Sequence, residues 1–540
     1  MINGKTIYLT QSDITDKALF YYIENNMERR ENMLRVVRTE NGLIRGLPAA
    51  DPRITSFKGI PFAAPPTGEN RWRAPQPVKD WDGVLNAFEF APISLQANSA
   101  LDKNNIYARE WHVDPDIPMS EDCLYLNVWT PARSADEKLP VYVWFFGGGF
   151  QVGYTSEMEF DGERIARRGI VVVTVNYRLN TFGFLCHPEI TAEAPEAPAN
   201  FGLLDQQAGL RWVKRNIAAF GGDPDNIAIG GQSAGGGSVL YHLTSPKNAG
   251  LFNRAIIQSG IFAPLYPDNM MPRMNMTLEE AEKEGVKFFE FLGVSSLKEA
   301  RELDAKYILD KTLEYNRFWW PVEDGIFCTG NAFQLFLENK RWQVPILTGH
   351  TSNEFFAVPK AKSKEEFKCM AIELFGEDAD EFLDLCRFND STLEDVIKNS
   401  TVNSIEYAIR VAAKANSDTG SNVPIYYYVF DAEIPGWDNP GAFHSVDLWF
   451  TFETLAKCWR PFVGKHYDLA RQMCNYWANF IRSGDPNGKD STGEDMPKWE
   501  PYTVDAPYGM LFADKAEFVR KRPGELMDFL VRQYSKRKSS

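Results

Sequence analysis

The chain has 540 residues, of which 44% are apolar and 24% are charged, and its formal net charge is −15. The composition supplies a large core, and the acidic balance argues against nucleic acid as a partner, because phosphate binding needs a basic surface. No apolar run approaches the ~20 residues that cross a bilayer, so we expect no membrane association.

The N-terminal segment 1–33 is polar and without a convincing period, and we expect it to be an extension of the folded domain. It lacks a basic region followed by an apolar stretch and a small-residue cleavage site, so no export signal is evident. The seven cysteines are scattered and form no C-x-x-C pair. These features together predict reduced thiols and a cytoplasmic location.

Regular patterning begins with "LRVVRTENGLIRG", where Asn41-Gly42 between two apolar runs predicts a hairpin. Strands are expected over 124–131, 140–146 and 169–177, then a helix over 205–220, a strand over 226–231 and another within 250–260. Apolar strands separated by helices predict an α/β fold, with a mostly parallel sheet and helices on both faces.

After this alternation the sequence pattern becomes mostly helical. We expect 264–342 and 357–421 to be mainly helical insertions that cover the site. "TLEEAEKEGVKFFEFLG" opens with a capping box, Thr277 with Glu280, and stops at Gly293. Two strands, over 343–349 and 423–432, interrupt or follow these helices. No internal repeat is found, so 34–537 is expected to be a single domain.

A glycine cluster surrounds one serine in "NIAIGGQSAGGGSVLYHL", between a strand-like and a helix-like run. The glycine spacing of a dinucleotide fingerprint is not met, and no lysine closes a phosphate loop. The segment Gly231-Gln232-Ser233-Ala234-Gly235 fits the G-x-S-x-G pattern that holds a nucleophilic serine on a sharp strand-to-helix turn.

A serine nucleophile needs a histidine base oriented by a carboxylate, in the chain order serine, acid, histidine. Of six histidines, two precede the serine, and His242 lies on the following helix. His466 is expected in a bland surface role and His350 precedes any nearby acid, so His444, in the loop "GWDNPGAFHSVDLWF", is the favoured base.

The acid should follow the carboxyl end of a strand, as Glu354 does in "QVPILTGHTSNEFF". Asp324 is the competitor, but it precedes its nearest strand. The intermediate also needs backbone N–H donors, and "PVYVWFFGGGF" offers Gly147 to Gly149 at the end of another strand. The carboxyl ends of strands are where open α/β sheets bind ligands.

With these residues in hand, the chain resembles the type-B carboxylesterases, a group that includes cholinesterases and bacterial para-nitrobenzyl esterases. The likeness covers roughly 34–530 and rests on "FKGIPFAAPPTGENRWRAP", "SEDCLYLNVWTP", "FFGGGF", "NYRLNTFGFL", the block ending in "GGQSAGGGSV", and "GAFHSVDLWFTF". The last stretch is closest to the para-nitrobenzyl esterases and favours a bacterial enzyme.

The resemblance implies an α/β-hydrolase fold with an antiparallel N-terminal hairpin, and a triad of Ser233, Glu354 and His444. It places the oxyanion donors on the backbone of Gly148, Gly149 and Ala234. It also gives Ser259 and Asp447 as a polar pair near the histidine, for which ordinary hydrogen bonding is the alternative.

Three departures from the family pattern matter. Gln232 replaces the glutamate of cholinesterases, which argues against a quaternary ammonium substrate. Cys123 has no partner, since Ser94 stands where secreted relatives have cysteine. Phe355 follows the acid where glycine is usual, so the acid loop is expected to differ in shape.

Together these features predict a serine carboxylic-ester hydrolase acting on neutral esters with short-to-medium acyl or aromatic groups. An amidase, thioesterase or lactonase would use the same groups, and a non-catalytic binding module of the same fold is the remaining alternative. We expect no metal or organic cofactor, and a monomer or homodimer. The expected pocket residues are Phe146, Phe150, Gln232, Trp319, Phe355 and Trp449.

Overall fold

The computed structural model describes residues 33–537, apart from 99, 101, 103, 264, 267–275, 491 and 521. The extension expected at 1–33 therefore lies, except for Met33, outside the described residues. No helix of the described part is long and apolar enough to cross a membrane.

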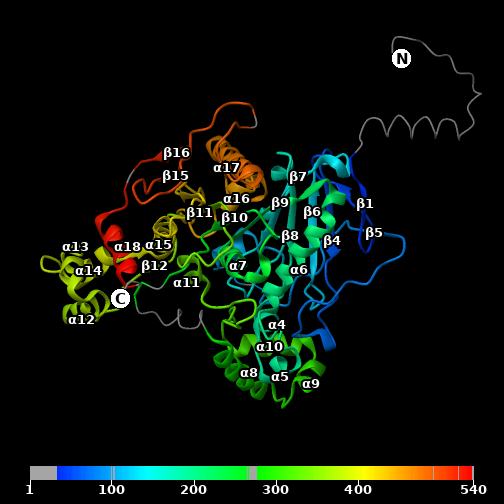
Figure 1. The fold of residues 1–540 in the computed structure, drawn as a ribbon, viewed down its shortest axis with the longest axis horizontal. Coiled ribbons are helices and arrows are strands. Elements are labelled where there is room, and N and C mark those ends of the chain that lie inside the picture. Colours follow the sequence, from blue (N-terminus) through cyan, green and yellow to red (C-terminus); the bar gives the residue numbers. More distant parts are fainter. Residues whose placement is uncertain are drawn as a thin grey trace, which may run out of the picture.

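The fold is built on one large sheet with strand order β16-β15-β14-β11-β10-β9-β7-β8-β6-β4-β3 (Figure 1). The run from β8 to β15 is parallel, whereas β3, β4, β6 and β16 pair antiparallel at the two edges. Its strands are β3 (Leu47–Pro48), β4 (Thr55–Pro61), β6 (Tyr125–Thr130), β7 (Leu139–Phe145), β8 (Val171–Val175), β9 (Gly222–Gln232), β10 (Arg254–Gln258), β11 (Ile346–Thr351), β14 (Ile425–Phe430), β15 (Gly509–Phe512) and β16 (Ala516–Val519). The predicted mostly parallel sheet is confirmed.

The predicted hairpin at Asn41-Gly42 forms between β1 (Val36–Thr39) and β2 (Gly42–Arg45), which pair antiparallel. It does not join the large sheet. Instead β2 pairs with β5 (Val84–Asn86), so that the three strands make a separate small sheet.

Alternating side chains of the strands enter two different cores, as the twofold period of a strand requires. On β7, Val141, Val143 and Phe145 face one core, and Tyr142 and Trp144 face the other. The first core includes side chains of α6 (Phe201–Asn216), α7 (Ala234–Thr244), α11 (Ala332–Leu337), α15 (Ser404–Asp418) and α18 (Glu525–Arg537). The second includes those of α8 (Leu278–Leu292), α16 (Leu448–Thr451) and α17 (Gly464–Ser483). Helices thus cover both faces, as predicted.

The two segments expected as insertions are mainly helical. The first holds α8, α9 (Leu297–Glu302), α10 (Ala305–Tyr315) and α11, and the second holds α12 (Lys364–Phe375), α13 (Ala379–Leu385), α14 (Leu393–Ser400) and α15. Figure 1 shows α8 to α10 gathered with α5 (Pro188–Glu193), and α12 to α14 gathered beside α18. The capping box of Thr277 and Glu280 is present and α8 ends at Gly293 in the left-handed region.

Shorter helices complete the chain: α2 (Ile106–Glu110), α3 (Glu163–Ala166) and α4 (Asn180–Phe184). A two-stranded sheet joins β12 (Phe356–Ala357) to β13 (Val402–Asn403), so the segment after Glu354 pairs with the residues directly before α15. An isolated bridge pairs Asn353 with Phe443. The acid loop therefore contacts both the second insertion and the loop of His444.

Candidate active site

Ser233 stands at the junction between β9 and α7, where the chain turns sharply. Its backbone has φ 55° and ψ −124°, a conformation that a non-glycine residue rarely adopts. The serine N–H donates to the carbonyl of Gln258 on β10 at 2.9 Å. The strained turn therefore places Ser233 just beyond the carboxyl end of the sheet.

The glycines beside Ser233 are required by close packing. A Cβ on Gly235 would lie 2.1 Å from the carbonyl oxygen of Phe145, and one on Gly231 would lie 2.3 Å from the carbonyl carbon of Gly235. Any side chain at either position would force β7, β9 and α7 apart. The cluster thus lets the helix start directly against the strands that support the serine.

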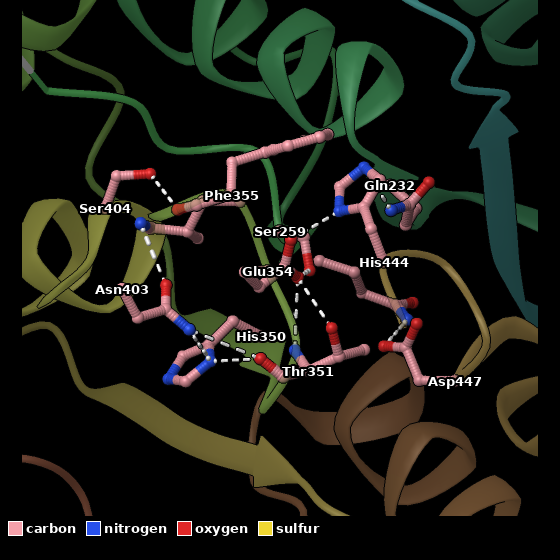
Figure 2. Close-up of polar contacts among 12 residues, drawn as sticks. Gln232, Ser259, His350, Thr351, Glu354, Phe355, Asn403, Ser404, His444 and Asp447 are labelled. Atoms are coloured by element: carbon pink, nitrogen blue, oxygen red, sulfur yellow. Dashed lines mark hydrogen bonds and ion pairs between the residues drawn. The ribbon is translucent and has the colours of Figure 1, made fainter. Parts of the chain in front are cut away.

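Glu354 and His444 are brought together from loops after β11 and β14. Nδ1 of His444 donates to Oε2 of Glu354 at 2.5 Å (Figure 2). The other oxygen, Oε1, accepts from the hydroxyl of Ser259 at 2.6 Å and from the N–H and hydroxyl of Thr351 at 3.1 and 3.0 Å. Each carboxylate oxygen is thus held by a donor.

The electrostatics of this pair favour an ionised acid. Burial disfavours the charge on Glu354, but the neighbouring His444 and the hydrogen bonds from His444 and Ser259 outweigh it and hold the pKa of the carboxyl below its ordinary value. An ionised Glu354 fixes the proton of His444 on Nδ1, which leaves Nε2 as an acceptor.

The contact of His444 on its other side is with Gln232. The amide nitrogen of Gln232 lies 3.2 Å from Nε2 of His444. Within the part of the chain that the structure describes, no hydrogen bond joins the Ser233 hydroxyl to His444. The structure therefore brings the acid and the histidine into a bonded pair and places the serine beside them on the same cavity.

Gly148 and Gly149 form a turn directly after β7, with φ of 105° and 63°. Glycine is required at Gly148, because a Cβ there would lie 2.1 Å from the carbonyl oxygen of Val152. Among the hydrogen bonds of the described residues, none uses the N–H groups of Gly148, Gly149 or Ala234. These donors are thus available to an incoming ligand.

A cavity of about 820 Å³ joins these elements. We call the side formed by Gly147–Gly149, Gln232–Ala234 and His444 the polar wall. We call the apolar part of the lining the apolar wall; it consists of Phe262, Ala263, Leu265, Tyr266, Phe318, Trp320 and Phe355–Val358. Phe318, Phe355 and Phe356 are each more than half exposed. The cavity thus combines polar groups with exposed aromatic rings.

Of the six expected pocket residues, Gln232 and Phe355 line this cavity, and the Phe355 ring packs against the imidazole of His444 with centroids 4.7 Å apart. The other four expected pocket residues do not line it, and this corrects the sequence interpretation. Phe146 stacks on Tyr177, Phe150 packs on Phe184, Trp319 packs on Phe288 and Trp449 packs on Trp111.

The sequence interpretation chose the wrong residues because neighbouring residues in the chain face different parts of the structure, and only one of each pair faces the cavity. Trp320 lines the cavity in place of Trp319, and Leu448 in place of Trp449. Sequence reasoning also missed Tyr107 and Trp111, which reach the cavity from the loop around α2. No motif marks that loop.

Two acidic residues of the cavity were missed as well. Glu157 and Glu159 follow the glycine turn in "GYTSEMEF" and line the cavity with His112. The sequence did carry a signal for them. Two carboxyl groups stand at alternate positions shortly after the glycine run that was expected to approach a ligand.

Asp447 lies behind the polar wall, fully buried. One carboxyl oxygen accepts from Tyr428 at 2.8 Å and from Gln258 at 3.1 Å, and the other has no partner among the described residues. Burial raises its pKa to about 6 despite these bonds. Asp447 supports β10 and β14 and makes no hydrogen bond to His444 in the described structure, whereas Ser259 does contact the acid.

The rejected candidates have other partners. Asp324 accepts from three backbone N–H groups, at 326 to 328, and from Asn200. His242 is buried between Gln206 and Asn248. His466 is buried too, bonded to the backbone around Glu433, so its expected surface position was wrong.

The described residues contain no cluster of three or more histidine, cysteine or acidic side chains that could hold a metal ion. All seven cysteines lie in the described part, and none forms a disulfide.

Comparison with known proteins gives a consistent result. The model of the carboxylesterase family matches residues 34–526. The chain is 30% identical to a fumonisin B1 esterase of Sphingopyxis macrogoltabida over 86% of its own length and 84% of that protein's. It is also 30% identical to a cholinesterase of Mus musculus, over 90% and 84% of the two chains.

Solved structures agree with these relatives. A PNB esterase superposes with a TM-score of 0.73 at 28% identity, covering 92% of this chain and 99% of the other. Geobacillus stearothermophilus carboxylesterase EST55 gives a TM-score of 0.72 at 30% identity, with the same coverage.

Proposed function

Because this chain belongs to the carboxylesterase family and is a carboxylic ester hydrolase, we propose that it works through an acyl-serine formed on Ser233. The observation that carries this proposal is the bonded pair of Glu354 and His444 beside a strained serine, on one cavity with a turn of free backbone N–H groups.

In the proposed reaction, Nε2 of His444 takes the hydroxyl proton of Ser233 as the oxygen attacks the ester carbonyl. Glu354 stabilises the imidazolium through Nδ1. For this step the Gln232 amide has to leave Nε2, so substrate binding exchanges one hydrogen bond of His444 for another. The protonated histidine then passes its proton to the leaving alcohol.

The carbonyl oxygen becomes an oxyanion during the attack, and the N–H groups of Gly148, Gly149 and Ala234 are proposed to receive it. Each such donor contributes about 3 kcal/mol to the transition state. Ala234 also begins α7, so its N–H lies at the positive end of a helix dipole. Water, activated by His444, then hydrolyses the acyl-serine in the reverse sequence.

The apolar wall supports a preference for esters with an uncharged, short-to-medium acyl or aromatic group. Apolar and aromatic side chains at such a site gain from excluding water around a similar surface. The same cavity is also lined by two acidic residues, Glu157 and Glu159.

Replacing Ser233 with alanine tests the proposal. We expect at least a 10⁴-fold loss of ester hydrolysis and a complete loss of covalent labelling by an organophosphate. The matched control is Ser238→Ala on the same helix, since that hydroxyl is buried and bonded to Gln206. Labelling and near-normal activity in Ser238→Ala, with neither in Ser233→Ala, support the mechanism. Full activity in Ser233→Ala overturns it.

A further inference from the structure

Two buried carboxyl groups, Glu157 and Glu159, line the cavity, and a third, Glu110, lies within electrostatic reach of Glu159. The three differ in how they are paired. Glu110 is bonded to Arg460 at 2.6 Å and to the indole N–H of Trp459 at 3.2 Å. Oε1 of Glu157 contacts Nε2 of His112 at 3.0 Å and the N–H of Tyr154 at 2.9 Å. Glu159 has no such partner.

No donor among the described residues reaches either oxygen of Glu159, although the residue is 0% exposed. Glu159 sits on the short helix η4 (Met158–Phe160), whose position is fixed from outside because Thr454 donates to the Glu159 carbonyl at 3.1 Å. Glu159 is among the residues that line the same cavity as Ser233 and His444.

An unpaired buried carboxyl group is costly, and a protein normally pairs it or keeps it neutral. Burial and the adjacent Glu157 raise the pKa of Glu159 well above its ordinary value. Arg460, the cation that holds Glu110, is bonded to Glu110 and Asp438. The two oxygens of Glu159 thus keep unused hydrogen-bonding capacity in a residue that lines the cavity.

We propose that Glu157 and Glu159 form a subsite that binds a protonated amine carried by the ester substrate. This inference rests on the proposed function and narrows it. An ammonium group supplies both what Glu159 lacks, an N–H donor and a positive charge. A metal ion fits less well, because the described residues hold no cluster of three or more suitable ligand residues here. The subsite thus restores, at another position, an anionic group that Gln232 does not provide.

The test compares two pairs of isosteric esters at pH 7, where aliphatic amines are protonated. One pair places the amine in the alcohol half: 2-(dimethylamino)ethyl butyrate against 3-methylbutyl butyrate. The other places it in the acyl half: ethyl 4-(dimethylamino)butanoate against ethyl 5-methylhexanoate. We expect the amine ester of at least one pair to show a kcat/KM about tenfold higher or more, as a charge-assisted hydrogen bond gives.

The discriminating variant is Glu159→Gln, with Glu373→Gln as the matched control. Glu373 is exposed on α12, and its change alters the net charge equally. The amine-to-neutral ratio should fall toward one in Glu159→Gln and stay at the wild-type value in Glu373→Gln. Direct binding of the amine ester to Ser233→Ala protein, measured by calorimetry, should weaken about tenfold when Glu159→Gln is added.

Each outcome has one meaning. If wild-type protein hydrolyses the neutral esters but shows a ratio near one in both pairs, the subsite is wrong and the proposed function stands. A ratio that survives Glu159→Gln also overturns the subsite. If neither ester of any pair is hydrolysed, the proposed function fails first. Equal preference for a quaternary choline ester, which has no N–H, shows charge attraction without the proposed hydrogen bond and contradicts it.

Discussion

The two walls of the cavity are built in opposite ways. On the polar wall, the positions of Ser233, Gly148 and Ala234 are set by the backbone at the ends of β7 and β9, and His444 is held by a bonded carboxylate. On the apolar wall, Phe318 and Phe356 are more than half exposed and come from loops within or beside the insertions. The groups proposed to react are thus held in place by backbone geometry and a bonded carboxylate, whereas the groups proposed to contact the substrate are exposed side chains.

This difference predicts that changes in the polar wall alter the rate of the chemical step, whereas changes in the apolar wall alter substrate binding. The following variants test that division, from the largest expected effect to the smallest.

Glu354→Gln should lower kcat about 10³- to 10⁴-fold, since an amide in place of the carboxylate no longer fixes the Nδ1–H form of His444. Steady-state kinetics on a chromogenic ester provide the measurement. Asp324→Asn, the rival acid in the sequence, is the control. It should lower stability by weakening the bonds to 326–328 but leave kcat of the folded protein within about twofold. The reverse pattern would assign the acid to Asp324.

Asp447→Asn should change the pH dependence of stability. The pKa of Asp447 is about 6 in the folded protein against an ordinary 3.8, so its effect runs opposite to that of a salt-bridged acid. Folding is favoured by this group below pH 3.8 and loses that contribution as pH rises through 6. The difference corresponds to about 3 kcal/mol.

Urea unfolding of both proteins at pH 4.5 and pH 8 measures this effect. Relative to the variant, the wild type should lose about 2 kcal/mol between the two pH values, because part of the full contribution is already lost at pH 4.5. Replacing an exposed acid, as in Asp505→Asn, should leave the pH dependence of stability as it is in the wild type. Parallel curves for wild type and Asp447→Asn would show that the buried group does not titrate in this range.

Phe318→Ala should raise KM for aromatic esters about threefold to tenfold, with little change in kcat, because part of an apolar contact surface is lost. The melting temperature should hardly move, since the ring is 54% exposed. Trp437→Ala, exposed but outside the cavity, is the control for removing a surface ring. A fall in kcat with unchanged KM would contradict the division between the walls.

Much of the polar wall could be predicted from the sequence, because each part depends on a local pattern. The elbow around Ser233 is a five-residue motif between a strand and a helix, and His444 was reached by excluding five other histidines. Sites formed by tightly packed backbone can be predicted in this way, because they require glycine at specific positions.

The apolar wall could not be predicted in the same way, because which of two adjacent aromatic rings faces a cavity depends on packing between distant segments. Trp319 and Trp320 are indistinguishable in sequence, yet only Trp320 lines the cavity. The contact between Gln232 and His444, in place of one between Ser233 and His444, depends on side-chain rotamers that no motif specifies.

The short pairing of β12 with β13 has a consequence for engineering. Phe355, next to the acid, accepts from the N–H and hydroxyl of Ser404 at the start of α15, and Phe356 and Ala357 pair with Val402 and Asn403 (Figure 2). The loop that carries Glu354 is thus bonded to the second helical insertion, a segment that would be an obvious choice for deletion. A shortened variant made by deleting 357–421 would keep Ser233 but lose the contacts that align Glu354.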